Sequence, residues 1–175
     1  MTESIQYEVI KRLDDVEIRQ YPTIILAVVG GMSDDGAFSI LFRYITGENR
    51  SSKKVAMTIP VISREPSSQE IAMTRPVVSD GKSFSFVLPS FYSIDTAPQP
   101  MDDRIKLMEV RARKLAVMSF SGRGHDHSIQ KNEGVLLEKL RMAGMPAKGP
   151  VFLMRYNSPF TPGFLRHNEV AVEID

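Results

Sequence analysis

The side chains of this sequence whose type and spacing could do chemistry are its three histidines. His125 and His127 lie two positions apart, so in an extended segment their rings point the same way and could bind a metal ion or a haem iron. His167 stands in a later loop and could do the same. The alternative is that all three are solvated, because loops are usually exposed. No third ligand lies near the first pair, so we expect no structural zinc site.

Catalytic signatures are missing from the sequence. Asp102 and Asp103 could form a carboxylate pair, but adjacent aspartates fit a turn better. There is no Gly-x-Ser-x-Gly elbow, no phosphate-binding loop and no dinucleotide fingerprint, and Gly122-Arg123-Gly124 is too short to indicate more than a turn. The absence of cysteine excludes disulfides, thiolate zinc sites, thiol catalysis and iron–sulfur clusters. We therefore expect that the protein is not an enzyme.

Length and composition are those of an ordinary globular protein. The 175 residues suit one domain spanning 1–175, with 42% apolar and 25% charged residues and a net charge of +1. Such a charge gives no basis for binding nucleic acid, which would need a basic face. No secretory signal is visible at the N-terminus, and the longest apolar run, Ile24–Val29, is too short to span a bilayer. We expect a cytoplasmic protein without a membrane partner; the sequence leaves the oligomeric state open, with a monomer favoured.

Hydrophobic periodicity predicts two helices among many strands. Four apolar residues recur at helical spacing after Asp34-Asp35 and predict a first helix that ends at Gly47. They are Phe38, Leu41, Phe42 and Ile45. A second helix is predicted from Asp126 or Ser128 to Gly144, with an apolar stripe of Ile129, Leu136, Leu137 and Leu140. Strands are predicted over 7–12, 16–21, 23–29, 54–59, 70–73, 76–79, 84–88, 104–110, 114–120, 151–156 and 169–174.

The order of these elements indicates an internal repeat. Val16–Ile18 lies 89 positions before Ile105–Leu107. At the same offset, Leu26–Val28 corresponds to Leu115–Val117, and each copy then passes through a break into a helix.

We therefore predict an α+β fold in which a duplicated ββαβ-type unit, roughly 5–90 and 100–175, forms a distorted antiparallel β-barrel with two helices. A fold of this kind offers a ligand site where a helix crosses the sheet or at the barrel mouth. Ten methionines are available to line such a site, although methionine also fills ordinary cores.

Six blocks, in the same order, resemble segments of one family. They are Val16-Glu17-Ile18-Arg19-Gln20-Tyr21-Pro22, Ala37-Phe38 through Tyr44-Ile45-Thr46-Gly47-Glu48-Asn49, Lys54-Val55-Ala56-Met57-Thr58-Ile59-Pro60-Val61, Phe86-Val87-Leu88-Pro89, Tyr156-Asn157-Ser158-Pro159-Phe160 and Arg166-His167-Asn168-Glu169-Val170. Each block is short, but together they cover nearly the whole chain. The sequence is similar to the SOUL/haem-binding-protein family.

This resemblance implies that the chain binds haem or a related tetrapyrrole in an apolar groove near the first helix, as a carrier, buffer or sensor. Phe38 and Phe42 would contact the face of the macrocycle. Arg43 and Arg166 would meet its propionates, because arginine binds carboxylates in bidentate fashion. Asp35 stands where the family often has a basic residue, which weakens the propionate clamp.

The resemblance leaves the ligation of the iron open. His167 stands where the family block has a second arginine, so it either adds an iron ligand or only replaces a charge. His125 and His127 are the other candidate ligands, and some members of the family are thought to bind without an iron ligand.

Two other functions stay open at this point. The predicted fold also resembles the ligand-sensing domains of the GyrI-like superfamily, which would make the chain an effector-binding module for a non-haem hydrophobic or cationic ligand. A carboxylate at the base of the pocket would favour a cation, and Glu109 and Glu173 lie on predicted strands. The third reading is an enzyme acting on a hydrophobic substrate.

Overall fold

The computed structural model describes residues 3–50, 70–71, 73–80, 82–122, 126–156 and 162–175. The chain divides into two compact units, and each unit is assembled from separate stretches of sequence. Unit 1 is formed by Met1–Ser4, Ile24–Arg75 and Lys82–Val110. Unit 2 is formed by Ile5–Thr23, Pro76–Gly81 and Arg111–Asp175. The predicted strand over 54–59 and the side chain of His125 lie outside the described residues.

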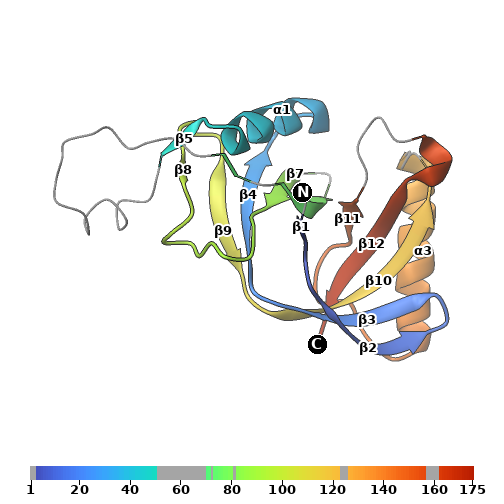
Figure 1. Ribbon diagram of the computed structural model, residues 1–175. Coiled ribbons are helices and arrows are strands. Elements are labelled where there is room, and N and C mark those ends of the chain that lie inside the picture. Colours follow the sequence, from blue (N-terminus) through green and yellow to red (C-terminus); the bar gives the residue numbers. More distant parts are fainter. Residues whose placement is uncertain (1–2, 51–69, 72, 81, 123–125, 157–161) are drawn as a thin grey trace, which may run out of the picture. The chain divides into compact units, whose positions relative to one another are not determined.

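Unit 1 pairs one helix with a three-stranded antiparallel sheet. The strands lie in the order β7 (Ser83–Val87), β4 (Ile24–Gly30) and β9 (Lys106–Val110). Ala27 at the centre of β4 is opposite Phe86 on one side and Leu107 on the other. Helix α1 (Asp34–Ile45) packs against β4 and β7 (Figure 1).

Three short strands complete unit 1. β5 (Asn49–Arg50) and β8 (Gln99–Pro100) pair antiparallel with each other. β1 (Glu3–Ser4) runs parallel to the beginning of β6 (Thr74–Ser79). The strand predicted over 70–73 is wrong at Glu70, Ile71 and Met73, because the Ile71 amide donates to the carbonyl of Ile45 at the end of α1 (2.7 Å) instead of to a neighbouring strand.

The sequence around α1 explains where this helix begins and ends. Ser33, and not one of the two aspartates after it, is the N-cap, and its Oγ accepts a hydrogen bond from the Gly36 amide (3.3 Å). At the other end, the Thr46 hydroxyl donates to the carbonyl of Phe42 (2.8 Å). The buried face is formed by Ala37, Ile40, Leu41, Tyr44 and Ile45. The predicted apolar stripe is therefore wrong at Phe42, which is 48% exposed.

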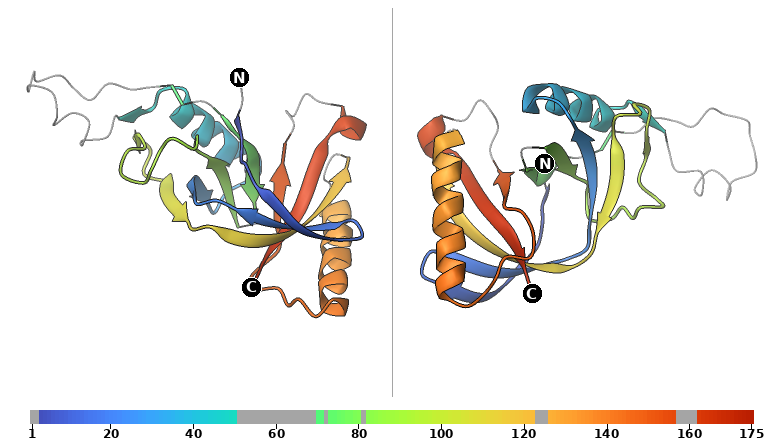
Figure 2. Two further views of the ribbon diagram at one scale, coloured as in Figure 1. Left: turned by 60° about the horizontal axis from the view of Figure 1, so that its bottom comes forward. Right: turned by 180° about the vertical axis from the view of Figure 1, so that it is seen from behind.

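Unit 2 places a larger antiparallel sheet against the second helix, α3 (Asp126–Met142). Its strands follow the order β2 (Glu8–Leu13), β3 (Val16–Tyr21), β10 (Arg113–Ser121), β12 (His167–Ile174) and β11 (Phe152–Arg155). Residues Val77–Ser79 of β6 pair with β11. The turn η1 (Gly163–Leu165) leads into β12. In Figure 2 the orange helix α3 runs along the red and yellow strands β12 and β10.

The sheet of unit 2 has a buried apolar cluster on each face. One face packs under α3, where Leu136 and Leu140 meet alternate residues of four strands. Those strand residues are Val16, Ile18, Ala116, Met118, Leu153, Val170, Val172 and Ile174. The other face holds Tyr21, Leu115, Val117, Phe152, Met154 and Ala171. Leu137, predicted for the buried stripe of α3, lies instead on the outer side and is 41% exposed.

The predicted barrel is wrong, because the sheet is open. Among the described residues, β2 pairs only with β3 and β9 pairs only with β4, so each unit ends in an unclosed edge. Strand β2 carries exposed charges and a register shift between Val9 and Lys11, which are features of edges that avoid further pairing. The α+β class is confirmed, with a mostly antiparallel sheet and two helices in the described part of the chain.

Candidate functional site

Four phenylalanines of unit 1 form an aromatic platform on α1. Phe38 stacks on Phe42, with ring centroids 6.0 Å apart and planes 14° from parallel. Phe38 also meets Phe86 and Phe84 of β7 edge-on, at 5.4 and 6.4 Å. The two β7 rings are buried, Phe38 is partly buried, and Phe42 is the outermost ring. The outer ring is thus held against an aromatic support and presents apolar surface to a flat ligand.

Arg43 lies beside this platform in a group of mixed charges. Its Nε is 3.9 Å from a carboxylate oxygen of Glu48, and both side chains are about half exposed. Hydrogen bonds from Arg104 hold the pKa of Asp102 down to about 2, and the charge of Arg43 contributes to the same effect. Arg43 can bind a ligand carboxylate only in competition with these acids. Exposed ion pairs are weak, so such an exchange costs little.

Arg166 and His167 belong to unit 2, whereas Phe38, Phe42 and Arg43 belong to unit 1. Arg166 is partly buried just before β12. The His167 ring, at the first residue of β12, lies 5.0 Å from the ring of Tyr156. Its Nε2 is 3.4 Å from a carboxylate oxygen of Glu169. His167 could therefore bind iron through Nε2 only by leaving this contact.

His127 is an exposed residue in the first turn of α3 and not in a loop. Over the residues that the structure describes, no group of three or more histidine, aspartate or glutamate side chains could hold a metal ion. No helix in the same part of the chain is long and apolar enough to cross a membrane.

The sequence interpretation missed a buried ionic cluster in unit 2. Arg19 on β3 and Glu169 on β12 are 2% and 1% exposed and form a bidentate pair, with Nη1–Oε1 and Nη2–Oε2 distances of 3.0 and 2.7 Å. The Tyr156 hydroxyl donates to Oε1 (2.5 Å) and the Ser119 hydroxyl to Oε2 (3.2 Å). With His167 nearby, donors surround both oxygens of Glu169.

The guanidinium of Arg19 is held from several other sides. Nη2 also donates to Glu17 (2.8 Å), and Nη1 to the hydroxyl of Tyr21 (2.9 Å). Its central carbon lies 4.1 Å above the ring of Tyr7, a cation–π arrangement. Its Nε has no hydrogen-bond partner among the described residues. The cluster lies buried on this face of the sheet, and the positive charge of Arg19 is balanced there by Glu169 and Glu17.

The ionisation of these groups follows from their surroundings. Burial alone would raise the pKa of Glu169, but hydrogen bonds from Arg19 and Tyr156 and the charge of Arg19 outweigh it and lower that pKa. Burial, together with the charge of Glu169, raises the pKa of Tyr156. Burial raises the pKa of Tyr21 to about 12, although Arg19 opposes this. Glu169 is thus held as a carboxylate and both tyrosines stay neutral at ordinary pH.

The sequence holds one signal for this cluster, the alternation of apolar and polar residues along 16–21. Val16 and Ile18 share one face of the strand, and Glu17, Arg19 and Tyr21 share the other. The aromatic Tyr21 on the polar face indicates burial there. The cluster unites three of the blocks that resemble the SOUL family, namely those beginning at Val16, Tyr156 and Arg166.

Comparison with solved structures shows the class of fold. A hydrolase from Listeria innocua has a TM-score of 0.55 and 9% identity, with 95% of this chain and 94% of that chain covered. The EcmrR C-terminal domain has a TM-score of 0.56 and 8% identity, with 98% of this chain and 99% of that chain covered. EcmrR in a complex with DNA has a TM-score of 0.58 and 10% identity, with 91% of this chain and 57% of that chain covered. These likenesses show the fold alone, and they agree with the expected resemblance to GyrI-like domains.

The model of the family described as "SOUL heme-binding protein" matches residues 2–173. The chain therefore belongs to the SOUL haem-binding protein family. Membership supports a haem- or tetrapyrrole-binding role in general, in a family of ligand-binding proteins. No curated protein matches the sequence.

Proposed function

We propose that the protein binds haem or a related tetrapyrrole against the Phe42 face of α1, as a carrier or buffer. The observation that carries this proposal is the exposed ring of Phe42, supported by Phe38 and by the two phenylalanines of β7. What distinguishes Phe42 from the other exposed phenylalanines is this aromatic support, which holds its ring in place as apolar surface for a flat ligand. A macrocycle would cover it at a gain of about 25 cal/mol per Å² of apolar surface removed from water.

Arg43 supports the orientation of the ligand. It follows Phe42 directly, so its guanidinium can meet a propionate at the edge of a macrocycle that lies on the ring. Arg166 lies on unit 2, so the propionate role that the resemblance gives it is tested separately below. Iron ligation is not required for this mode, since apolar contact with the ring and a charge-assisted hydrogen bond from Arg43 supply the affinity.

The test is an absorbance titration of the full chain with haemin, and with protoporphyrin IX as the iron-free ligand. We expect saturable one-to-one binding of both. Phe42→Asp should abolish the binding of both ligands, whereas Phe91→Asp, at another exposed phenylalanine of unit 1, should bind like the parent. Normal binding by Phe42→Asp would refute this site.

Variants of the polar residues separate the remaining roles. Arg43→Glu should weaken both ligands by about tenfold, the value of one charge-assisted hydrogen bond. The same loss in Arg166→Glu would support the propionate role that the resemblance gives to Arg166, and normal binding would remove it from the site. Arg12→Glu, at an exposed arginine of β2, is the matched control. His167→Ala should leave protoporphyrin IX binding intact. A selective loss of haemin binding in His167→Ala would instead assign the iron ligand to this histidine.

The second candidate function is an effector-binding module, which the fold shared with the EcmrR C-terminal domain favours. The carboxylates of unit 2 argue against a cationic effector. Glu169 is saturated by donors, and Glu173 pairs with Arg113 (3.3 Å) and Lys148 (3.9 Å). A neutral or anionic flat ligand fits better. Displacement of protoporphyrin IX by tetraphenylphosphonium would support the cationic alternative.

We propose binding rather than catalysis for this chain. The hydrolase from Listeria innocua is 9% identical to it, and a likeness at that identity supports a shared fold but no shared activity. Turnover of a tetrapyrrole that disappears in His127→Ala or His167→Ala would support the enzyme reading.

A further inference from the structure

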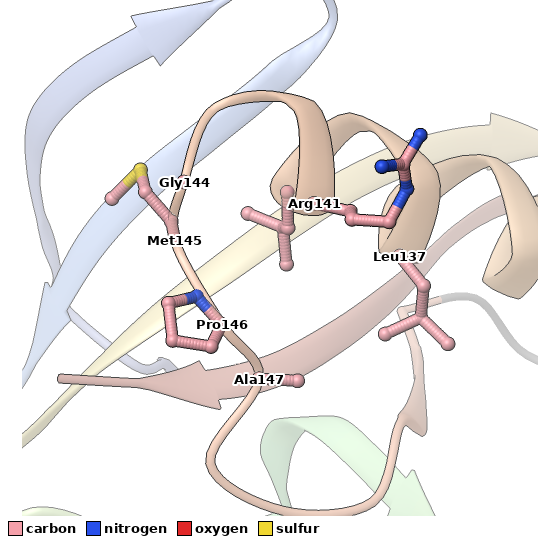
Figure 3. Close-up of a pocket in the computed structure, with 7 residues that line it drawn as sticks. Leu137, Arg141, Gly144, Met145, Pro146 and Ala147 are labelled. Carbon is pink, nitrogen blue, oxygen red and sulfur yellow. The ribbon is translucent and has the colours of Figure 1, made fainter.

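A groove of about 360 Å³ lies at the C-terminal end of α3 in unit 2. Its lining is mainly apolar, and Leu137, Leu140 and Arg141 of the helix form one wall. The chain that follows the helix forms the other wall, from Gly144 to Ala147 (Figure 3). The volume falls at the lower end of the range for small-molecule sites.

Backbone hydrogen bonds hold both walls in place. Gly144 has a φ of +69°, and the helix ends with the Met145 amide donating to the carbonyl of Leu140 (2.9 Å) and the Gly144 amide to that of Arg141 (3.2 Å). The returning chain bridges Ala147 to Ile174 of β12, and the Lys148 amide donates to the carbonyl of Glu173 (2.7 Å). The groove is therefore preformed, which removes an ordering cost from binding.

The floor and rim of the groove differ in chemistry. Leu140 is buried in the core beneath α3, and Met145 packs against the same core. Leu137 is exposed at the edge, so it offers apolar surface to a ligand. The one charged residue of the lining is Arg141, whose side chain is 72% exposed.

Glu138 displays how a carboxylate meets this arginine. Its two oxygens accept hydrogen bonds from Nε (3.0 Å) and Nη2 (2.6 Å) of Arg141, a bidentate arrangement. An exposed ion pair three residues apart on a helix contributes little to stability. A ligand carboxylate can therefore replace Glu138 on Arg141 at small cost.

We propose that this groove binds a small amphipathic carboxylate, with its apolar body between Leu137 and the turn at Met145 and its carboxylate on Arg141. A cavity of about 150 Å³ in another protein accepts benzene, so this groove suits an apolar body of about ten heavy atoms. A tetrapyrrole is several times larger. The groove is thus a different site from the aromatic platform of α1, and it does not depend on the proposed haem binding.

The experiment titrates the full ¹⁵N-labelled chain with octanoate and, as the uncharged analogue, with 1-octanol. We expect saturable octanoate shifts in the amide signals of Leu137, Arg141 and Ala147. Octanol should bind about tenfold more weakly, which is the effect of losing one charge-assisted interaction. Equal affinity for the two ligands, or octanoate shifts confined to other residues, would overturn the proposal.

Variants give a second test. Arg141→Glu should weaken octanoate by about tenfold or more without changing octanol, and Ala147→Phe, which fills the groove, should abolish both. Arg12→Glu is the matched control on the same unit. The Phe42→Asp variant should keep its octanoate affinity, so a failure of the proposed haem site can be told apart from a failure of the proposed groove site. Concentration-dependent dimerisation that Ala147→Phe removes, without octanoate binding by the parent, would show that a second copy occupies the groove.

Discussion

The substitution Arg19→Met removes one partner of the buried ion pair in unit 2 and keeps most of the apolar stem. Glu169 is then left in the core with hydrogen bonds from Tyr156 and Ser119 and with Nε2 of His167 3.4 Å away, but without the guanidinium that balances its charge. The substitution also removes the guanidinium from the ring of Tyr7 and from Glu17. Because the charge of Glu169 cannot reach water, the folded state carries the cost.

Breaking one side of a buried ion pair costs about 3–5 kcal/mol. We expect the lower part of this range, because Nε of Arg19 is buried without a partner among the described residues and its removal relieves the cost of that unsatisfied donor. For a chain of this length, the midpoint of thermal unfolding should fall by about 2–4 °C per kcal/mol, or roughly 6–16 °C. Arg12→Met, at an exposed arginine that also contacts Glu17, should stay within about 0.5 kcal/mol of the parent.

The dependence on pH gives a sharper test than the magnitude. In the parent, the pKa of Glu169 is lowered on folding, so its contribution to stability is present above the unfolded value and is lost as the pH falls through the folded value. In Arg19→Met, burial is opposed by fewer donors and raises that pKa, so folding takes up a proton. The destabilisation should therefore be greater at about pH 7 than at about pH 4.

The assay is urea unfolding of parent and variant, followed by circular dichroism at both pH values. A loss of less than about 1 kcal/mol at pH 7, or a loss that grows as the pH falls, would refute the reasoning. The double variant Arg19→Met/Glu169→Leu should recover much of the stability, because an apolar pair replaces an unpaired charge.

Two further predictions concern the helices. Gly134→Ala should raise the free energy of unfolding by about 0.5–1 kcal/mol, because this glycine lies inside α3 and an added Cβ meets no atom within 4 Å. An unchanged or lower thermal midpoint would contradict this. Tyr44→Phe should cost about 1–3 kcal/mol in urea unfolding, because the buried hydroxyl donates to the carbonyl of Pro98 (2.6 Å) and leaves it unpaired when removed. Phe91→Leu, at an exposed ring, is the control that should stay near the parent.

Local patterns predicted most strands and both helices, because alternation and helical spacing are properties of neighbouring residues. The strand expected over 16–21 is β3 with the same bounds, and the second helix begins at Asp126, one of its two predicted starts. Barrel closure depends on which strands remain unpaired at the two edges, which short-range periodicity does not contain. The duplicated unit stays a prediction, which the central position of β4 and β10 between antiparallel partners supports.

The site was predictable only in part. Helical spacing and the resemblance both pointed to Phe38 and Phe42. Spacing alone placed Phe42 in the core, whereas the helix is turned so that Ile40 and Tyr44 are buried and Phe42 is exposed. The ionic cluster joins Arg19 to Glu169, which are 150 positions apart. Each residue alone reads as a polar position on a strand, and only the three-dimensional pairing shows that their charges cancel.

The segments of the two units alternate along the sequence, which delays folding while the chain is being synthesised. Val16 of β3 pairs with Met118 of β10, and Ile24 of β4 pairs with Val110 of β9, so neither sheet can be completed until more than half of the chain has been made. At about 5–20 residues per second, β3 waits about 5–20 s for its partner. Contacts so distant along the chain also slow folding after release. Because the segments of the two units alternate along the chain, no single cut would separate one whole unit from the other.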